Sequence, residues 1–241
     1  MRNKIIRLQN VDSTHKFAIR LIENKKATSC VIVAKNQTNG IGRCGRFWIS
    51  SEGNLFTSII RKSLRNEDLG QLSLTIACTV HDAISDYVPD NLYLHWPNDI
   101  YYKKSKIAGI LITVIDDWMI ISIGVNVNFA PPVVDAVSLV DICEFKFIPV
   151  EQMLSGVLVK LNKWLDNLHS FGFSHIKRYW LRYINEIDCR VVIRNGQDSL
   201  TGVFKGIDNS GKLILEREGK NLLISSGDMF LNTESITVNH E

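Results

Sequence analysis

The residues best suited to chemistry lie in one loop that follows a short apolar stretch. Residues 37–48 read Gln-Thr-Asn-Gly-Ile-Gly-Arg-Cys-Gly-Arg-Phe-Trp, so glycines alternate with Arg43 and Arg46. Glycine lets successive backbone N–H groups turn toward one point, and arginine offers a planar fork of donors that matches carboxylate or phosphate oxygens. The glycine loop, residues 37–48, is therefore predicted to bind an anion. The alternative is a mobile surface turn in which glycine only interrupts the neighbouring strands.

Three further segments carry polar groups that a ligand could use. Asp12-Ser13-Thr14 precedes a helical pattern, where its side chains either cap the helix or face a ligand. His95-Trp96-Pro97-Asn98-Asp99 ends a short strand, and its oxygens suit a turn, a ribose or a magnesium ion. Lys106 starts an apolar strand from which its amine could reach a ligand, and Gly109 leaves room for close approach to the backbone.

The elements that must position these residues follow from the spacing of apolar side chains. The pattern predicts strands over residues 5–11, 30–35, 54–60, 92–94, 106–115 and 118–127. It predicts helices over residues 15–24, 69–87, 150–168 and 174–184. The strands on either side of the glycine loop are expected to place it at a sheet edge. Residues 130–141 are irregular and are expected to form a mobile flap over the bound ligand.

The composition changes near residue 186. From there, short apolar runs are separated by Asn-Gly, Asp-Asn-Ser-Gly and Glu-Gly turns, which predicts a small meandering sheet or barrel of about fifty residues. We therefore expect a catalytic domain at residues 1–185 and a C-terminal domain at residues 186–241. The fold class is α+β, with a mixed or antiparallel sheet packed with helices.

Composition excludes several classes of protein. With 241 residues, 45% of them hydrophobic and 22% charged, the chain has ample material for a core. Its apolar runs are shorter than a membrane span, and a net charge of +3 is too slight to indicate nucleic acid. Its five cysteines are scattered without a Cys-x-x-Cys pair, which argues against a disulfide framework and a zinc site. A cytoplasmic location is expected.

Four motifs, in the same order, resemble those of the biotin protein ligases, which join biotin to a carboxylase carrier domain. Asp12-Ser13-Thr14 is similar to DST(N), and residues 37–48 are similar to Q-T-x-G-R-G-R-x-G-R-x-W. Residues 95–109 resemble K-W-P-N-D followed by K-[IL]-A-G, and residues 124–128 resemble G-I-N-V-N. The resemblance covers the full length. Because the motifs begin within the first fifteen residues, it suggests a short form without the N-terminal DNA-binding domain of the repressor-type members.

The resemblance implies a fold and a reaction. The fold would be that of class II aminoacyl-tRNA synthetases and biotin/lipoate ligases, followed by a small SH3-like C-terminal β-barrel. The enzyme would use ATP and Mg²⁺ to convert biotin to biotinyl-5'-AMP, and would then transfer biotin to a lysine of a biotin carboxyl carrier domain. Neither nucleic acid nor membrane is expected as a partner. The sheet edges would allow a homodimer, although no pattern requires one.

The resemblance also implies roles for individual residues. Arg43, Arg46 and Lys106 would be catalytic, because fixed positive charge must offset the repulsion between the biotin carboxylate and the ATP phosphate. The biotin-binding set is Ser13, Thr14, His15, Gln37, Ile41, Gly42, Arg43, Lys106 and Gly109, with Ser13, Thr14 and Gln37 at the ureido head. The ATP- or adenylate-binding set is Gly40, Gly42, Arg43, Gly45, Arg46, Asn98, Asp99, Lys106 and Asn126, with Asp99 as the metal ligand. Trp48 is expected to pack under the loop.

The chain departs from the family pattern at four positions. Ile41 replaces the first loop arginine, His15 an asparagine, His95 a lysine and Thr113 an acidic residue. The three catalytic cations are retained, so an active ligase with altered affinity or altered retention of the intermediate is expected. One alternative is a lipoate or octanoate ligase or transferase. An alternative of another class is a non-catalytic ligand-binding or adaptor module, although such a module would not need a phosphate site.

Overall fold

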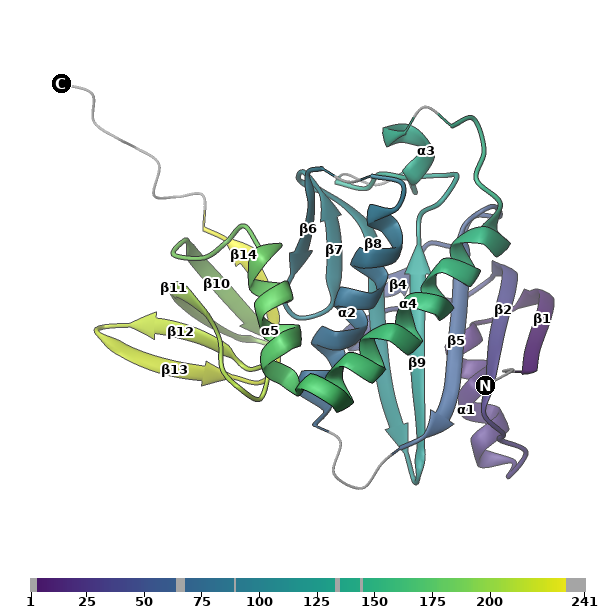
Figure 1. Ribbon diagram of the computed structural model, residues 1–241, viewed down its shortest axis with the longest axis horizontal. Helices are drawn as coiled ribbons and strands as arrows, with labels where there is room; N and C mark the ends of the chain where they lie inside the picture. Colours follow the sequence, from purple (N-terminus) through teal and green to yellow (C-terminus); the bar gives the residue numbers. More distant parts are fainter. Residues whose placement is uncertain (1–3, 64–67, 89, 133–134, 144, 233–241) are drawn as a thin grey trace.

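A seven-stranded mixed sheet forms the centre of the protein (Figure 1). The computed structural model describes residues 4–63, 68–88, 90–132, 135–143 and 145–232. The strand order is β1-β2-β5-β9-β8-β7-β6. The strands are β1 (Lys4–Val11), β2 (Cys30–Gln37), β5 (Leu55–Lys62), β6 (Leu92–His95), β7 (Asp99–Tyr102), β8 (Ser105–Ile115) and β9 (Trp118–Val125). Only β1 and β2 pair in parallel within this sheet; its other neighbours are antiparallel.

Helices cover both faces of this sheet. Helix α1 (Thr14–Glu23) packs over Ile32 and Ile60, whereas α2 (Leu69–Ser85) and α4 (Val150–Phe171) pack over Val31 and Ile59 (Figure 1). Alternate residues of a strand point to opposite faces, so the apolar runs supply both layers. The expected helices and strands are confirmed, with small differences at their ends. A short helix, α3 (Leu139–Ile142), begins within the segment expected to be irregular, residues 130–141, and starts with a capping box at Ser138.

A second sheet follows helix α5 (Phe173–Arg182). Its order is β13-β12-β11-β10-β14. The strands are β10 (Arg190–Asn195), β11 (Asp198–Ile207), β12 (Leu213–Arg217), β13 (Lys220–Ile224) and β14 (Asp228–Leu231). The meander is confirmed, but β13 and β14 do not pair in the described part of the chain, so the sheet is open rather than a closed barrel. Trp180 of α5 packs edge-on against Phe204 of β11, with ring centroids 6.5 Å apart, and joins the two parts.

The glycine loop lies over the middle of the seven-stranded sheet. It forms a small ribbon of β3 (Gly40–Ile41) and β4 (Phe47–Trp48) around one 3₁₀ turn (Arg43–Gly45). The prediction of a sheet edge is wrong. Strand β1 adds outside β2, and β9 adds outside β5, so the strands that flank the loop are interior. The loop therefore connects two interior strands of the sheet.

Candidate active site

A cavity of about 440 Å³ lies on the α1 face of the sheet, beneath the glycine loop. This volume is typical of small-molecule sites. The expected site residues that line it are Ser13, Thr14, His15, Gln37, Ile41, Gly42, Arg43, Arg46, Asn98, Asp99, Lys106, Gly109 and Asn126. Gly40 and Gly45 are not among the lining residues. Gly40 is buried against the Trp48 carbonyl, and a side chain at Gly45 would meet open space.

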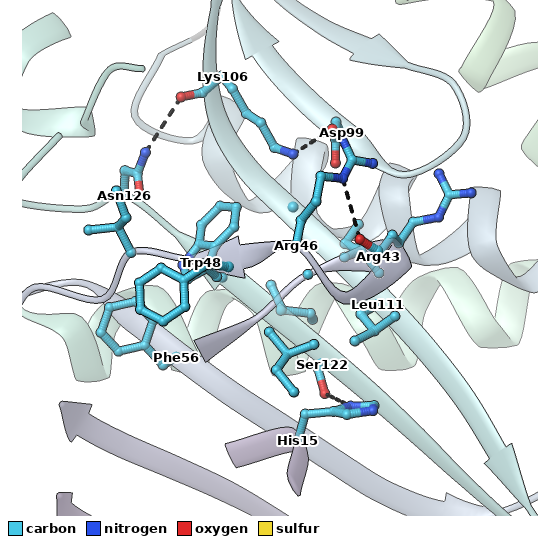
Figure 2. Close-up of a pocket in the computed structure, with 18 of the residues that line it drawn as sticks. His15, Arg43, Arg46, Trp48, Phe56, Asp99, Lys106, Leu111, Ser122 and Asn126 are labelled. Atoms are coloured by element: carbon cyan, nitrogen blue, oxygen red, sulfur yellow. Dashed lines mark hydrogen bonds and ion pairs between the residues drawn. The ribbon is translucent and has the colours of Figure 1, made fainter. Parts of the chain in front are cut away.

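Lys106 lies at one end of this cavity. Its Nζ donates to Asp99 Oδ2 at 2.5 Å (Figure 2). The backbone of Lys106 is equally fixed: its N–H donates to the Asp135 carbonyl, and its carbonyl accepts from Val137 N–H. The Nδ2 of Asn126 donates to the carbonyls of Val137 and Lys106, at 3.2 and 3.5 Å. The described part of the expected flap is therefore anchored beside the amine that was predicted to be catalytic.

The two loop arginines lie at the same end and reach the C-terminal sheet. Arg43 Nη1 donates to Asn98 Oδ1 at 3.0 Å, and both of its terminal nitrogens lie 3.3 Å from the Gly227 carbonyl. Arg46 Nη2 donates to Asp228 Oδ1 at 2.6 Å, and Arg43 Nη1 lies 3.5 Å from the same oxygen. Sequence reasoning missed Asp228. It is a single acidic residue at the start of a strand, 182 positions after Arg46, and carries no motif.

The backbone of the glycine loop supplies fewer free donors than expected. Gly42 N–H donates to the Arg46 carbonyl at 2.7 Å, and Arg46 N–H donates to the Arg43 carbonyl at 3.1 Å. Both groups are engaged within the loop. An anion at this end would therefore be held mainly by guanidinium and ammonium groups.

An aromatic wall forms the middle of the cavity. The Trp48 ring crosses two glycines on neighbouring strands, so that a Cβ built on Gly124 would lie 2.6 Å from it and one on Gly109 would lie 3.0 Å from it. The packing predicted for Trp48 is confirmed. The space left by Gly109 is filled by this ring rather than left open. Phe56 and Leu111 lie on the same stretch of the cavity (Figure 2).

The opposite end is polar, enclosed and uncharged. Gln37 Oε1 accepts from Thr14 N–H at 2.8 Å and from Thr14 Oγ1 at 3.1 Å, while Gln37 Nε2 donates to Ser50 Oγ at 2.9 Å. Ser13 caps α1 through Lys16 N–H and also lines the cavity, so it serves the helix and faces the site. His15 is 6% exposed, and burial lowers its pKa to about 4, which keeps the ring neutral near pH 7.

Two buried hydroxyls of this end were missed at the level of sequence. Ser58 and Ser122 face each other across β5 and β9, and their Oγ atoms lie 2.8 Å apart. The available signal was a serine in the middle of each apolar strand, where an unbonded hydroxyl would be costly. This signal points to a hydrogen-bonded pair only when the register of β5 on β9 places the two serines opposite each other.

His95 joins the large sheet to the C-terminal sheet. Its Nδ1 lies 2.9 Å from Glu186 Oε1, and its Nε2 lies 2.9 Å from the Met229 carbonyl. Burial alone would lower the pKa of His95, but the hydrogen bond and charge of Glu186, together with Asp99 and the Met229 carbonyl, raise it above the ordinary value. Both ring nitrogens face acceptors, so both bonds form fully only when the imidazole is protonated.

This geometry predicts a pH-dependent stability. Because the pKa of His95 is raised in the folded state, its contribution is fully present below the unfolded value of 6.5 and is lost as the pH rises through the folded value. We expect the melting temperature of the wild type to fall by a few degrees relative to His95→Gln as the pH increases through this window. Thermal unfolding across a pH series measures this difference. His169→Gln, at an exposed helical site, is the control, and parallel curves for the wild type and His95→Gln would contradict the assignment.

Other kinds of site find no support in the part of the chain that the structure describes. There, no group of three or more His, Cys, Asp or Glu residues is placed to hold a metal ion by itself. No described helix has the length and apolar character required to span a bilayer. The five cysteines are free thiols.

Comparison with known proteins decides the family. Residues 7–128 match the model of the biotin/lipoate A/B protein ligase family, and residues 187–232 match the biotin protein ligase C-terminal domain. The chain belongs to the biotin/lipoate A/B protein ligase family. The two matched regions fall on the seven-stranded sheet and on the C-terminal sheet, respectively.

Relatives of this ligase family resemble the chain over nearly all of its length. The biotin–[acetyl-CoA-carboxylase] ligase of Paracoccus denitrificans is 28% identical over 238 residues, covering 92% of this chain and 98% of the relative. The bifunctional ligase/repressor BirA of Salmonella typhimurium is 30% identical over 224 residues, which cover 87% of this chain and 68% of the relative. Among solved structures, the biotin protein ligase from Aquifex aeolicus in complex with biotin and ATP superposes with a TM-score of 0.84 at 29% identity. The superposition covers 96% of this chain and 99% of that structure.

Two departures from the biotin protein ligase pattern contact each other. His15 Nε2 lies 3.2 Å from Thr113 Oγ1, so the histidine, which lines the cavity, is hydrogen-bonded to the threonine behind it. The departure at His95 likewise has defined partners in Glu186 and Met229. Ile41 lines the cavity and adds apolar surface where the ligase motif has a charge.

Proposed function

We propose that this chain is an ATP-dependent biotin protein ligase that forms biotinyl-5'-AMP and transfers biotin to a lysine of a biotin carboxyl carrier domain. The observation that carries the proposal is the order of chemistry along one cavity: hydrogen-bonding groups at Thr14 and Gln37, an apolar wall at Trp48, and cations at Lys106 and the loop arginines. Biotin has the same order, with a cyclic urea, an aliphatic chain and a carboxylate. A solved relative binds biotin and ATP together.

The polar end favours biotin over lipoate or octanoate. Buried hydrogen-bonding groups discriminate strongly against a ligand that leaves them unpaired. The ring of lipoate carries sulfur and no N–H, and octanoate carries no polar head. Either acid would leave the second lone pair of Thr14 Oγ1 and the second hydrogen of Gln37 Nε2 unpaired, beyond the bonds that these groups make within the protein. The match of residues 187–232 to the biotin protein ligase C-terminal domain points the same way.

Adenylation begins when a biotin carboxylate oxygen attacks the α-phosphorus of ATP and pyrophosphate leaves. Two anions must approach each other, and Lys106, Arg43 and Arg46 lie at the end of the cavity where this charge would develop. Asp99 orients the Lys106 amine through its Oδ2. Asn98 and the Gly227 carbonyl orient Arg43.

Asp99 also fits the role of a magnesium ligand. Its Oδ1 is buried and has no hydrogen-bond partner within the described residues, and hard cations prefer such oxygens. Since the described residues contain no complete metal cluster, Asp99 would hold Mg²⁺ together with phosphate oxygens of ATP. The ion would supply charge neutralisation at the phosphates. Asn126 contributes to the ATP side by holding Val137 beside Lys106.

In the second step, the carrier lysine attacks the carbonyl of the adenylate and AMP leaves, so no covalent bond to the enzyme is required. Residues 1–185 form the catalytic domain of this proposal. Residues 186–241 form the C-terminal domain, which reaches the site through Asp228. A cytoplasmic location and a homodimer formed through the edge strands are further predictions of the same proposal.

Transfer to a carrier tests the proposal. The protein is incubated with ATP, Mg²⁺, biotin and a purified biotin carboxyl carrier domain, and the carrier is weighed by intact-mass spectrometry. We expect a mass increase of one biotinyl group, abolished when the acceptor lysine of the carrier is replaced by arginine. An unmodified carrier, or a carrier that gains an octanoyl or lipoyl group instead when those acids are offered, would contradict it.

A further inference from the structure

A continuous chain of hydrogen bonds crosses the polar end of the cavity. It runs from Thr113 Oγ1 to His15 Nε2 (3.2 Å), from His15 Nδ1 to Ser122 Oγ (2.8 Å), to Ser58 Oγ (2.8 Å), to Thr14 Oγ1 (2.9 Å) and to Gln37 Oε1 (3.1 Å). Figure 2 shows the link between His15 and Ser122 at the end of the cavity away from Lys106. Four of its members, His15, Ser122, Ser58 and Thr14, are buried.

The direction of the protons in this chain follows from its last member. Gln37 Oε1 can only accept, and it also accepts the Thr14 backbone N–H, which fixes the amide orientation. A hydroxyl has one proton, so Thr14 gives its proton to Gln37 and must accept from Ser58. Ser58 has then used its proton and must accept from Ser122.

The same count fixes the tautomer of His15. Ser122 has given its proton to Ser58, so the contact with His15 can form only if His15 Nδ1 carries a hydrogen and donates it. His15 Nε2 then has a lone pair and accepts from the Thr113 hydroxyl. The neutral state of this ring, which burial favours, agrees with that arrangement.

We propose that His15 is a positioning residue that anchors this chain at the end opposite Gln37. The Nδ1–H of His15 holds Ser122, which through Ser58 keeps Thr14 Oγ1 in position as an acceptor for a ligand N–H. The inference deepens the proposed function and rests on it. The oxygen of Thr14 has two lone pairs, of which one accepts from Ser58 and one is left for the cavity. Gln37 Nε2 uses one hydrogen on Ser50 and retains a second. Thr14 and Gln37 together therefore suit the adjacent N–H and C=O groups of a cyclic urea.

A pair of variants with nearly the same shape separates this role from packing. His15→Asn can place an amide N–H where the histidine carries Nδ1, whereas His15→Leu has a similar branched side chain and no N–H. We expect His15→Leu to raise the KM for biotin by at least about tenfold, with kcat of ATP–pyrophosphate exchange nearly unchanged, because Ser122 loses its donor and no longer holds Ser58 and Thr14 in place. His15→Asn should raise that KM less than about threefold. Thr79→Val on α2, which removes a buried hydroxyl bonded to the Thr75 carbonyl, is the control and should leave KM unchanged.

The tautomer gives a test that needs no substrate. In protein labelled with ¹⁵N-histidine, the His15 signals, assigned by their loss in His15→Asn, should show a protonated Nδ1 and an unprotonated Nε2 at neutral pH. A protonated Nε2, or equal increases in KM for the asparagine and leucine variants, would overturn the inference. If His15→Leu does not fold, the tautomer and the His15→Asn kinetics still decide. Failure of the proposed function would appear differently, as a wild type that uses no biotin at all.

Discussion

Replacing Lys106 with alanine is expected to lower the rate of biotin adenylation by roughly 10²–10³-fold or more while leaving the fold intact. The Lys106 amine lies at the charged end of the cavity, where it donates to Asp99. Hydrogen bonds to Asp135 and Val137 fix the backbone of Lys106. Without it, the repulsion between the carboxylate and the α-phosphate is no longer offset at that point. ATP–pyrophosphate exchange in the presence of biotin measures the loss.

The control for this prediction lies two residues away. Lys104 is an exposed lysine at the tip of the same hairpin, and Lys104→Ala should exchange pyrophosphate at the wild-type rate. Circular dichroism and thermal unfolding would show whether Lys106→Ala retains the fold. A folded Lys106→Ala protein with near-normal exchange would exclude Lys106 from the adenylation step.

Reversing the charge of Asp228 is expected to raise the KM for ATP by about 10²-fold, with little change in biotin affinity. Asp228 Oδ1 lies 2.6 Å from Arg46 and 3.5 Å from Arg43. An arginine at residue 228 would place a third guanidinium against these two, and close like charges cost several kcal/mol when partly shielded from water. The loop arginines would be displaced from the position at which they meet the phosphates.

Two further variants make this prediction specific. Asp198→Arg introduces the same charge at an exposed position of the same sheet and should leave KM for ATP unchanged. Asp228→Asn keeps an oxygen toward Arg46 and should have a smaller effect. Steady-state ATP–pyrophosphate exchange at varied ATP concentration gives the KM for ATP, and calorimetry gives the affinity for biotin. Together they separate the effect of each variant on ATP from its effect on biotin. Equal effects of Asp228→Arg and Asp198→Arg would show that the C-terminal sheet does not help to order the loop.

Local features of the site could be predicted from the sequence because their causes lie within a few residues. Ser13 caps α1 as its position before the helical pattern indicated. Trp48 packs beneath the glycine loop because Gly109 and Gly124 leave the space that its ring fills. Lys106 stands at the start of an apolar strand and faces the cavity, as its position suggested.

The parts that were not predicted depend on how distant segments meet. The pairing of Ser58 with Ser122 follows from the register of β5 on β9, and each serine alone looks like an ordinary strand residue. Asp228 reaches Arg46 only because α5 docks the C-terminal sheet against the large one. The sequence predicts a sheet-edge position for the glycine loop, which is wrong, because local patterns do not reveal that β1 pairs outside β2 and β9 pairs outside β5.

The most direct test of the central claim is ATP–pyrophosphate exchange by the purified protein with Mg²⁺, comparing biotin, lipoate, octanoate and no acid. The predicted result is exchange with biotin and none with lipoate, octanoate or no acid, since adenylation is reversible and the polar end of the cavity suits a cyclic urea. Exchange supported by lipoate or octanoate in place of biotin would contradict the substrate assignment. No exchange with any acid would contradict the assignment of Lys106, Arg43 and Arg46 to adenylation.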